Sequence, residues 1–255
     1  MENIFVKKLY YCPIKSLSFN KIDKFIVKYK IGVLNDRCLA FTRGVTKKIA
    51  NSYINNTHKR KLNCFLTLRN TPYLKRYNFI FDNKKNIKMY SNKKILFETN
   101  LDDHNQVKII EQYIENLNTN ILKPIFLIYN NKIPFFDTNP QISVSLINLS
   151  TIRHIERKIN KKINFERFRA NIYIDNLKPW HEFNLINKYI YINKVKFLVN
   201  ERISRCSITN INPKNYNIDI NFPNTLNKLF GHIDLGIYLT PQNSGIINTN
   251  DPIYI

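Results

Sequence analysis

The sequence predicts an α+β protein that is mainly β. Many short runs rich in Ile, Val, Phe and Tyr alternate with polar turns, which is typical of strands. Helical periodicity occurs in only three stretches. The 255 residues are 44% hydrophobic, which is enough to bury a core in one large domain or two closely associated ones. The regular spacing of the short strands favours an antiparallel sheet that curls into a barrel or sandwich.

Strands are expected in both halves of the chain, where β-branched and aromatic residues lie between turn residues. In the N-terminal half we expect them at 3–11, 25–32, 37–43, 63–69, 77–81, 86–90 and 94–98. In the C-terminal half we expect them at 124–129, 142–147, 170–175, 188–199, 206–211, 235–240 and 252–255. The run 188–199 is expected to form a hairpin that turns at Asn193 and Lys194.

Helices are expected where apolar residues recur at steps of three and four. This spacing places one apolar face on 105–117 and another on 148–159, where Asn148 or Ser150 can cap the start. A third, short helix is expected at 223–231, which begins with Pro and ends with Gly. A soft boundary at 117–124 divides the chain into two predicted domains, 1–118 and 119–255.

The charge of the chain bears on its partners. With 40 Lys and Arg against 18 Asp and Glu, the net charge is +22, which indicates either an anionic partner or a compositional bias toward Lys. Bias is the simpler explanation, because the lysines are spread along the chain and no nucleic-acid-binding motif accompanies them. A basic nucleic-acid-binding barrel stays open as a weaker alternative, and we expect no nucleic-acid partner.

The location of the protein is also constrained. No apolar run approaches the ~20 residues that cross a bilayer. The N-terminus lacks the apolar core and cleavage site of a signal peptide. We therefore expect a cytoplasmic protein without a membrane span.

Cys206 is the candidate for metal or nucleophile chemistry. The four cysteines are scattered and form no CxxC pair, which argues against a zinc or iron–sulfur site built from cysteine pairs. Cys206 directly follows Arg205, whose fixed charge would favour the thiolate, a soft metal ligand and a nucleophile. The alternative is an ordinary cysteine at the start of a strand.

Two segments of the N-terminal half carry residues suited to an anion. In CPIKS, Lys15 and Ser16 offer an ammonium, a hydroxyl and backbone N–H groups, which can hold a phosphate. In LNDRCLAF, Arg37 opens a mostly apolar strand and can point into a site. A salt bridge with the neighbouring Asp36 is the alternative for Arg37.

Two segments of the C-terminal half are further candidates. In FERFRAN, Arg167, Arg169 and Asn171 are spaced two apart, which places them on one face of a strand and suits an anion with several oxygens. Internal ion pairs with Glu156 or Glu166 are the alternative. In KPWHE, we favour a surface or capping role for His181 over acid–base catalysis.

Taken in order, these segments resemble a known family. They are YYCPIKSLSFNKIDKFIV, IGVLNDRCLAFT, ISVSLINLSTIRHIE, FERFRANIYIDNLKPWHE, SRCSITNINPKNYNIDINFP and FGHIDLGIYLTPQNSGIINTNDPIYI. Over essentially its whole length the chain resembles the MOSC proteins, which include the mitochondrial amidoxime reducing component and the C-terminal part of molybdenum-cofactor sulfurase. The resemblance implies an N-terminal β-barrel-like domain packed against a MOSC β-barrel with a few helices.

The resemblance also implies a site for the molybdenum cofactor, a pterin phosphate that carries molybdenum on a dithiolene. Cys206 would be the metal ligand and the catalytic cysteine. The residues implied to bind the rest of the cofactor are Lys15, Ser16, Arg37, Asp137, Thr138, Arg167, Arg169, Asn171 and Arg205. Of these, Lys15, Ser16 and Arg37 would hold the phosphate.

The activity implied is that of a molybdenum-dependent oxidoreductase that reduces N-oxygenated, for example N-hydroxylated, small molecules. Electrons would come from a separate ferredoxin- or cytochrome-type protein. Phe183 and Asn212 stand where the family often has Asp, and these departures bear on substrate handling. The alternative function is a cofactor carrier or sulfur-transfer module that turns over no substrate.

Overall fold

The computed structural model describes residues 3–136 and 144–255. Over these residues the chain forms four α-helices, six short 3-10 helices and sixteen strands, so the predicted α+β, mainly β class is confirmed. The chain divides into two compact units. The first unit contains the segments Met1–Tyr10, Lys21–Leu34 and Gln141–Ile255, and the second contains Tyr11–Asn20 and Asn35–Pro140. The predicted sequence domains, 1–118 and 119–255, are a different division and stay a prediction.

The first unit is built on an eight-stranded, curled sheet with the order β16-β12-β13-β14-β10-β11-β1-β2. Its strands are β1 (Phe5–Tyr11), β2 (Asn20–Ile22), β10 (Val144–Asn148), β11 (Ile172–Asp175), β12 (Tyr189–Ile192), β13 (Val195–Ser204), β14 (Asp234–Pro241) and β16 (Ile253–Tyr254). β10 and β11 pair in parallel, and β14, β13, β12 and β16 follow β10 in antiparallel pairs. A second sheet of this unit has the order β15-β3-β4, with β3 (Lys24–Lys28), β4 (Gly32–Val33) and β15 (Gly245–Asn248).

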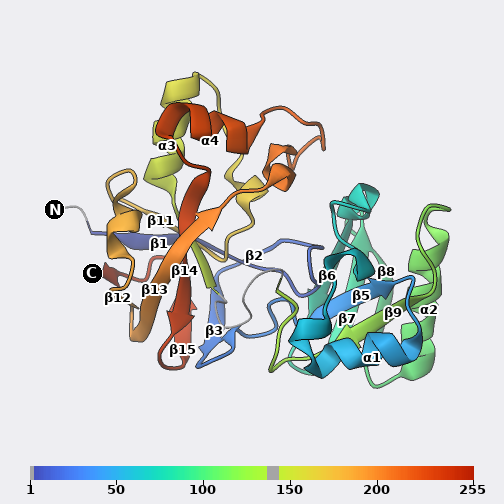
Figure 1. The fold of residues 1–255 in the computed structure, drawn as a ribbon. Helices are drawn as coiled ribbons and strands as arrows, with labels where there is room; N and C mark the ends of the chain where they lie inside the picture. Colours follow the sequence, from blue (N-terminus) through green and yellow to red (C-terminus); the bar gives the residue numbers. More distant parts are fainter. Residues whose placement is uncertain (1–2, 137–143) are drawn as a thin grey trace. The chain divides into compact units, whose positions relative to one another are not determined.

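Helix α3 (Leu149–Ile159) makes the crossover that the parallel pair requires. The side chain of Asn148 accepts a hydrogen bond from the Ser150 N–H at 3.0 Å and caps the helix, as predicted. Thr151, Ile152 and Ile155 form its buried face. α3 lies beside α4 (Phe222–Phe230), beyond one end of the large sheet (Figure 1).

The predicted hairpin in 188–199 is confirmed. Ile192 pairs with Val195, so Asn193 and Lys194 form the turn between β12 and β13. Asn193 has a φ of 53°, in the left-handed region that hairpin turns require and that Asn tolerates.

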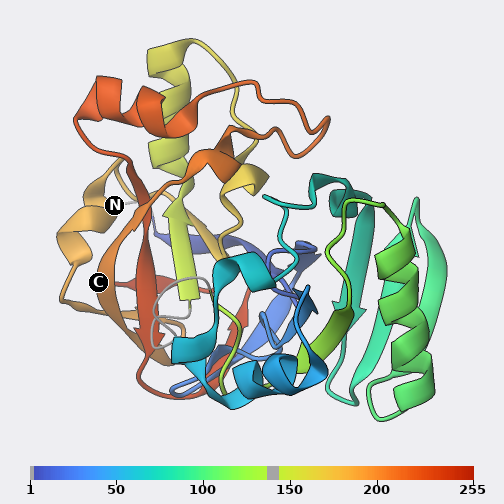
Figure 2. The same cartoon turned by 45° about the vertical axis from the view of Figure 1, so that its right-hand side comes forward.

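The second unit contains two small sheets and two helices. Its sheets are β5-β9 and β6-β7-β8, made of β5 (Leu39–Arg43), β6 (Tyr77–Phe81), β7 (Asn86–Ser91), β8 (Lys94–Asn100) and β9 (Ile125–Tyr129). Helix α2 (His104–Asn116), drawn in Figure 2, runs along β9. The carboxylates of Glu111 and Glu115 accept hydrogen bonds from the N–H groups of Leu127 and Ile125, at 2.7 and 2.6 Å. These side chains satisfy donors on β9 that no strand pairs.

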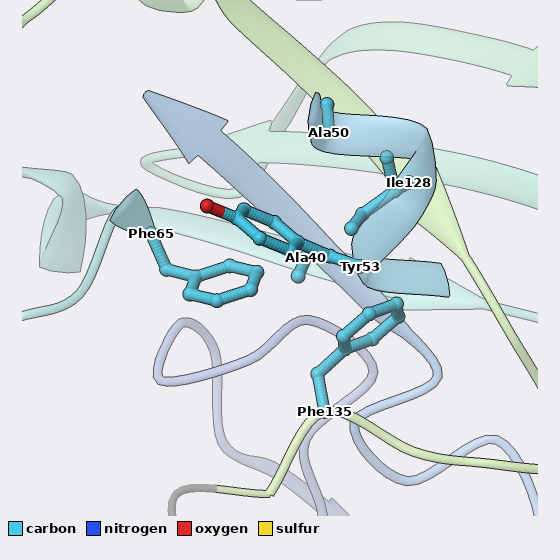
Figure 3. Close-up of a cluster of buried hydrophobic side chains, with 6 residues drawn as sticks. All are labelled: Ala40, Ala50, Tyr53, Phe65, Ile128 and Phe135. Carbon is cyan, nitrogen blue, oxygen red and sulfur yellow. The ribbon is translucent and has the colours of Figure 1, made fainter. Parts of the chain in front are cut away.

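A buried hydrophobic cluster of the second unit packs against one face of helix α1 (Lys47–Asn55), which contributes Ala50 and Tyr53. Figure 3 shows the buried cluster, which consists of Ala40, Ala50, Tyr53, Phe65, Ile128 and Phe135. The sequence does not predict a helix at 47–55, because its apolar pattern is short. The helix buries only Ala50 and Tyr53. The strand expected at 63–69 is wrong: a 3-10 turn, η2 (Leu62–Cys64), is found there.

None of the helices in the described part of the chain combines the length and apolarity needed to cross a bilayer.

Candidate functional site

Cys206 lies just beyond the end of β13. The strand ends at Ser204, and Cys206 is the N-cap of the 3-10 helix η6 (Ser207–Asn210), so the strand expected at 206–211 is wrong. The reason is local: the N–H and hydroxyl of Thr209 donate to the Cys206 carbonyl at 3.1 and 2.8 Å, which turns the chain. Cys206 is exposed and lies outside any disulfide, whereas Cys12 and Cys38 are buried. Its thiol can therefore reach a bound molecule.

Arg205 points in the opposite sense, into the protein. Its Nε donates to the Leu235 carbonyl at 2.8 Å, and its Nη1 donates to the Phe168 carbonyl at 3.2 Å. Burial lowers the pKa of Arg205 to about 10, so the guanidinium stays charged at neutral pH. These bonds fasten the residue before Cys206 to β14 and to the segment around Phe168. Direct contact of Arg205 with a cofactor stays a prediction.

Gly236 leaves room for this anchor. Its φ is +79°, and a Cβ at this position would lie 2.5 Å from the Leu146 carbonyl oxygen and 3.2 Å from Nη2 of Arg205. Glycine is required here because the backbone is left-handed and its neighbours approach closely.

Arg167 is the second anchor of the cysteine segment. It belongs to the 3-10 helix η4 (Phe165–Phe168), and β11 begins only at Ile172, so the shared strand face expected for Arg167, Arg169 and Asn171 is wrong. The side chain of Arg167 has 0% exposure. Its Nη1 donates to the Thr209 carbonyl at 3.1 Å, and its Nη2 donates to both carboxylate oxygens of Asp219 at 2.9 and 3.1 Å. The expected alternative of an internal ion pair is thus realised, with Asp219 as the partner instead of Glu156 or Glu166. A cofactor contact of Arg167 itself stays a prediction.

Arg169 ends η4 in a left-handed conformation, with a φ of 54°. An L-residue pays ~1–2 kcal/mol for this backbone, and such conformations cluster at ligand sites. The carbonyl of its neighbour Phe168 accepts from Arg205, the neighbour of Cys206, so the FERFR and RC segments lie side by side. Arg169 is half-buried, which leaves part of its surface for a ligand.

Asn171 is buried and holds strands together. Its Oδ1 accepts hydrogen bonds from the N–H and hydroxyl of Ser145 at 3.2 and 2.9 Å, and its Nδ2 donates to the Tyr10 carbonyl at 3.3 Å. It therefore links β10, β11 and β1. Its predicted cofactor contact stays a prediction.

Glu182 of the KPWHE segment forms hydrogen bonds with the start of helix α3. Glu182 has 0% exposure and accepts from the Thr151 hydroxyl at 2.7 Å and from Nδ2 of Asn148 at 3.0 Å. Burial raises the pKa of Glu182, although these two hydrogen bonds oppose the shift. His181 is exposed, as expected for a surface residue.

Lys15 and Ser16 lie in the second unit and are described there. Lys15 is 3% exposed; its Nζ donates to the Phe135 carbonyl at 3.2 Å and lies 5.4 Å from the centroid of the Phe65 ring. Ser16, with a φ of 62°, accepts the Leu68 N–H on its hydroxyl at 3.2 Å.

Arg37, also in the second unit, precedes β5 with a φ of 53°. It forms the ion pair with buried Asp36 that was the alternative at the sequence level, and it lies 5.4 Å from the centroid of the Phe136 ring. Asp36 in turn accepts the Cys12 N–H at 2.6 Å, which ties Arg37 to the CPIKS turn. Lys15, Ser16 and Arg37 are therefore neighbours along one connected loop system.

The predicted site residues thus fall into two groups. Arg167, Arg169, Asn171, Arg205 and Cys206 belong to the first unit, and Lys15, Ser16 and Arg37 belong to the second. The convergence of the two groups on one ligand stays a prediction. Asp137 and Thr138 lie outside the described residues.

Three residues with clear structural roles were missed at the sequence level: Thr209, Asp219 and Gly236. Gly236 carries a usable signal, since an isolated Gly inside a strand pattern marks a close backbone approach. No sequence pattern marks Thr209 or Asp219.

The Cys206 thiol suits a metal that is bound as part of a cofactor. Within residues 3–136 and 144–255, no three His, Cys, Asp or Glu side chains gather to form a metal site. The Cys206 thiolate and the dithiolene of the molybdenum cofactor are both soft sulfur ligands, so they suit the same metal. The exposed thiol suits its metal, and the Arg169 guanidinium suits an anionic group.

Comparison with known proteins identifies the C-terminal part of the chain. Residues 136–254 match the sequence model of the MOSC domain. The match identifies residues 136–254 as a MOSC domain, so the resemblance seen in the sequence is confirmed for this part of the chain. MOSC domains are associated with molybdenum-cofactor binding.

Other comparisons are weaker. The chain is similar to the YuaD protein of Bacillus subtilis, with 11% identity, coverage of 98% of this chain and 94% of that one, and a TM-score of 0.43. It is similar to YiiM from Geobacillus stearothermophilus, with 12% identity, coverage of 44% and 53%, and a TM-score of 0.35. No curated protein matches the sequence. The domain model alone therefore carries the assignment.

Proposed function

We propose that this protein binds the molybdenum cofactor and acts as an oxidoreductase on N-oxygenated small molecules. The observation that carries the proposal is an exposed cysteine, held at the head of η6 by a buried polar network, within a MOSC domain. When bound, the cofactor would supply the redox centre at which oxygen leaves nitrogen.

The residues of the chain divide this work between binding and support. Cys206 would hold the metal, and Arg169 would bind an anionic group of the pterin. Arg167, Arg205 and Asn171 would support these two positions, since their polar groups bond within the protein. Lys15, Ser16 and Arg37 would hold the phosphate.

The reaction also needs electrons and protons. Reduction of an N-hydroxylated compound consumes two electrons and two protons and releases water. A separate ferredoxin- or cytochrome-type protein would deliver the electrons, and the net charge of +22 favours an acidic one.

We place the protein in the cytoplasm, which cell fractionation would test.

The deciding experiment measures bound metal. The protein is purified from a host that makes the molybdenum cofactor, and molybdenum and pterin are quantified per chain. Molybdenum and pterin are expected with the wild type and with Cys64→Ser, a control at another cysteine that is not fully buried. Cys206→Ser is expected to lose the molybdenum. Wild-type protein without molybdenum, or a Cys206→Ser variant that keeps it, contradicts the proposal.

A cofactor carrier or sulfur-transfer module is the second candidate. The exposure of Cys206 favours it, because a transfer partner must reach the thiol. Loaded protein is assayed with a chemical electron donor and a hydroxylamine substrate. Turnover supports the oxidoreductase, and metal without turnover supports the carrier.

A further inference from the structure

Asp219 closes a loop that begins at Cys206. Ile211 and Ile218 pair in an antiparallel bridge. The Asp219 N–H donates to the Asn210 carbonyl at 3.3 Å. The segment after η6 therefore folds back on itself, and Asp219 returns to the helix that carries the cysteine.

Arg167 joins the two ends of this loop from outside it. Its guanidinium binds both carboxylate oxygens of Asp219 and the carbonyl of Thr209. Thr209 binds the Cys206 carbonyl through its N–H and hydroxyl. Arg167 and Thr209 thus connect the Asp219 carboxylate to the backbone of Cys206.

Asp219 holds further partners. Its carboxylate accepts Nδ2 of Asn212 at 2.9 Å, and its carbonyl accepts Nζ of Lys161 at 2.7 Å. Burial disfavours the charged carboxylate, but the hydrogen bond and charge of Arg167 outweigh it and hold the pKa of Asp219 below its ordinary value. A buried guanidinium that loses its carboxylate is costly, so each partner keeps the other in place.

We propose that Asp219 is a positioning residue for Cys206: it holds Arg167, and Arg167 holds the turn that carries the thiol. The consequence for metal binding rests on the proposed function, because residues that support a metal ligand set the orientation of that ligand. The effect on the thiol's position does not depend on a bound cofactor.

The test reads the mobility of residue 206 in metal-free protein. A nitroxide spin label is attached to Cys206 in a Cys64→Ser background; Cys12 and Cys38 are each 1% exposed and remain unlabelled. Electron paramagnetic resonance spectra are compared for Asp219→Asn, which loses the charge, and Asp219→Glu, which keeps it.

Asp175→Asn is the matched control. It breaks another Arg–Asp ion pair of the same unit, with Arg153, whose contacts do not involve the cysteine segment. Asp219→Asn is expected to increase the mobile fraction several-fold, Asp219→Glu to restore part of the immobile fraction, and the control to match the wild type. An unchanged spectrum in folded Asp219→Asn overturns the proposal.

If Asp219→Asn does not fold, Arg167→Lys decides. Lysine has a single Nζ where two guanidinium nitrogens bind the Asp219 carboxylate and the Thr209 carbonyl. Increased mobility supports the proposal, and an unchanged spectrum overturns it.

Molybdenum measurements on protein with bound cofactor distinguish a failure of this inference from a failure of the proposed function. Asp219→Asn is expected to weaken molybdenum binding roughly 10- to 100-fold, as loss of a residue behind a metal ligand does. Wild-type protein without molybdenum would contradict the proposed function and leave the spin-label result standing. Molybdenum in the wild type with unchanged label mobility would contradict this inference alone.

Discussion

Replacing Gly236 by Ala is expected to destabilise the first unit next to Cys206. The new Cβ would lie 2.5 Å from the backbone oxygen of Leu146 and 2.7 Å from Cγ1 of Ile147. Both atoms belong to residues of β10, the strand paired with β14, and the Leu146 oxygen is a backbone atom that moves only if the sheet shifts. Nη2 of Arg205 is 3.2 Å away and would be pushed from its carbonyl partner.

Two costs add up in this variant. Alanine in a left-handed conformation costs ~1–2 kcal/mol. Forcing an extra methyl group into a packed site costs a further ~1–3 kcal/mol. The free energy of unfolding is therefore expected to fall by about 2–5 kcal/mol.

Gly231→Ala separates the two costs. Gly231 has a φ of +74°, but a Cβ there would meet no atom within 4 Å, so only the backbone cost of ~1–2 kcal/mol applies. Urea unfolding is followed by the fluorescence of Trp180, the single tryptophan, which lies in the same unit. Equal losses of stability in the two variants would refute the packing argument.

Two further predictions concern buried groups. Because burial raises the pKa of Glu182 in the folded state, its contribution to stability is present below the ordinary Glu pKa and is lost as the pH rises through the folded value. The stability of the wild type relative to Glu182→Gln is therefore expected to fall from acid to neutral pH in urea titrations, and parallel curves would contradict this. Iodoacetamide is expected to modify Cys206 in native protein and to spare Cys12 and Cys38 until urea unfolds the chain, because only Cys206 of these three is exposed. Peptide mass spectrometry measures this, and early labelling of Cys38 would count against the fold.

The sequence predicted those features that depend on neighbours along the chain. The spacing of apolar residues identified α3, and the Asn148 cap marked its start. Alternation with a polar turn identified the β12–β13 hairpin. The ordered motifs identified the MOSC domain and drew attention to Cys206.

Long-range contacts decided what the sequence did not reveal. Arg167 and Arg205 look like ligand residues in sequence, but their guanidinium groups bond within the protein, to Asp219 and to the Leu235 carbonyl.

The sequence by itself therefore determined the fold class, the principal helices and the cysteine of interest, because periodicity and capping act over a few residues. Only the tertiary structure decided which charged groups face inward and what holds Cys206. The Asp219 carboxylate that holds Arg167 comes from 52 positions further along the chain. Burial of that guanidinium demands a partner, and the folded chain alone determines which carboxylate lies within reach.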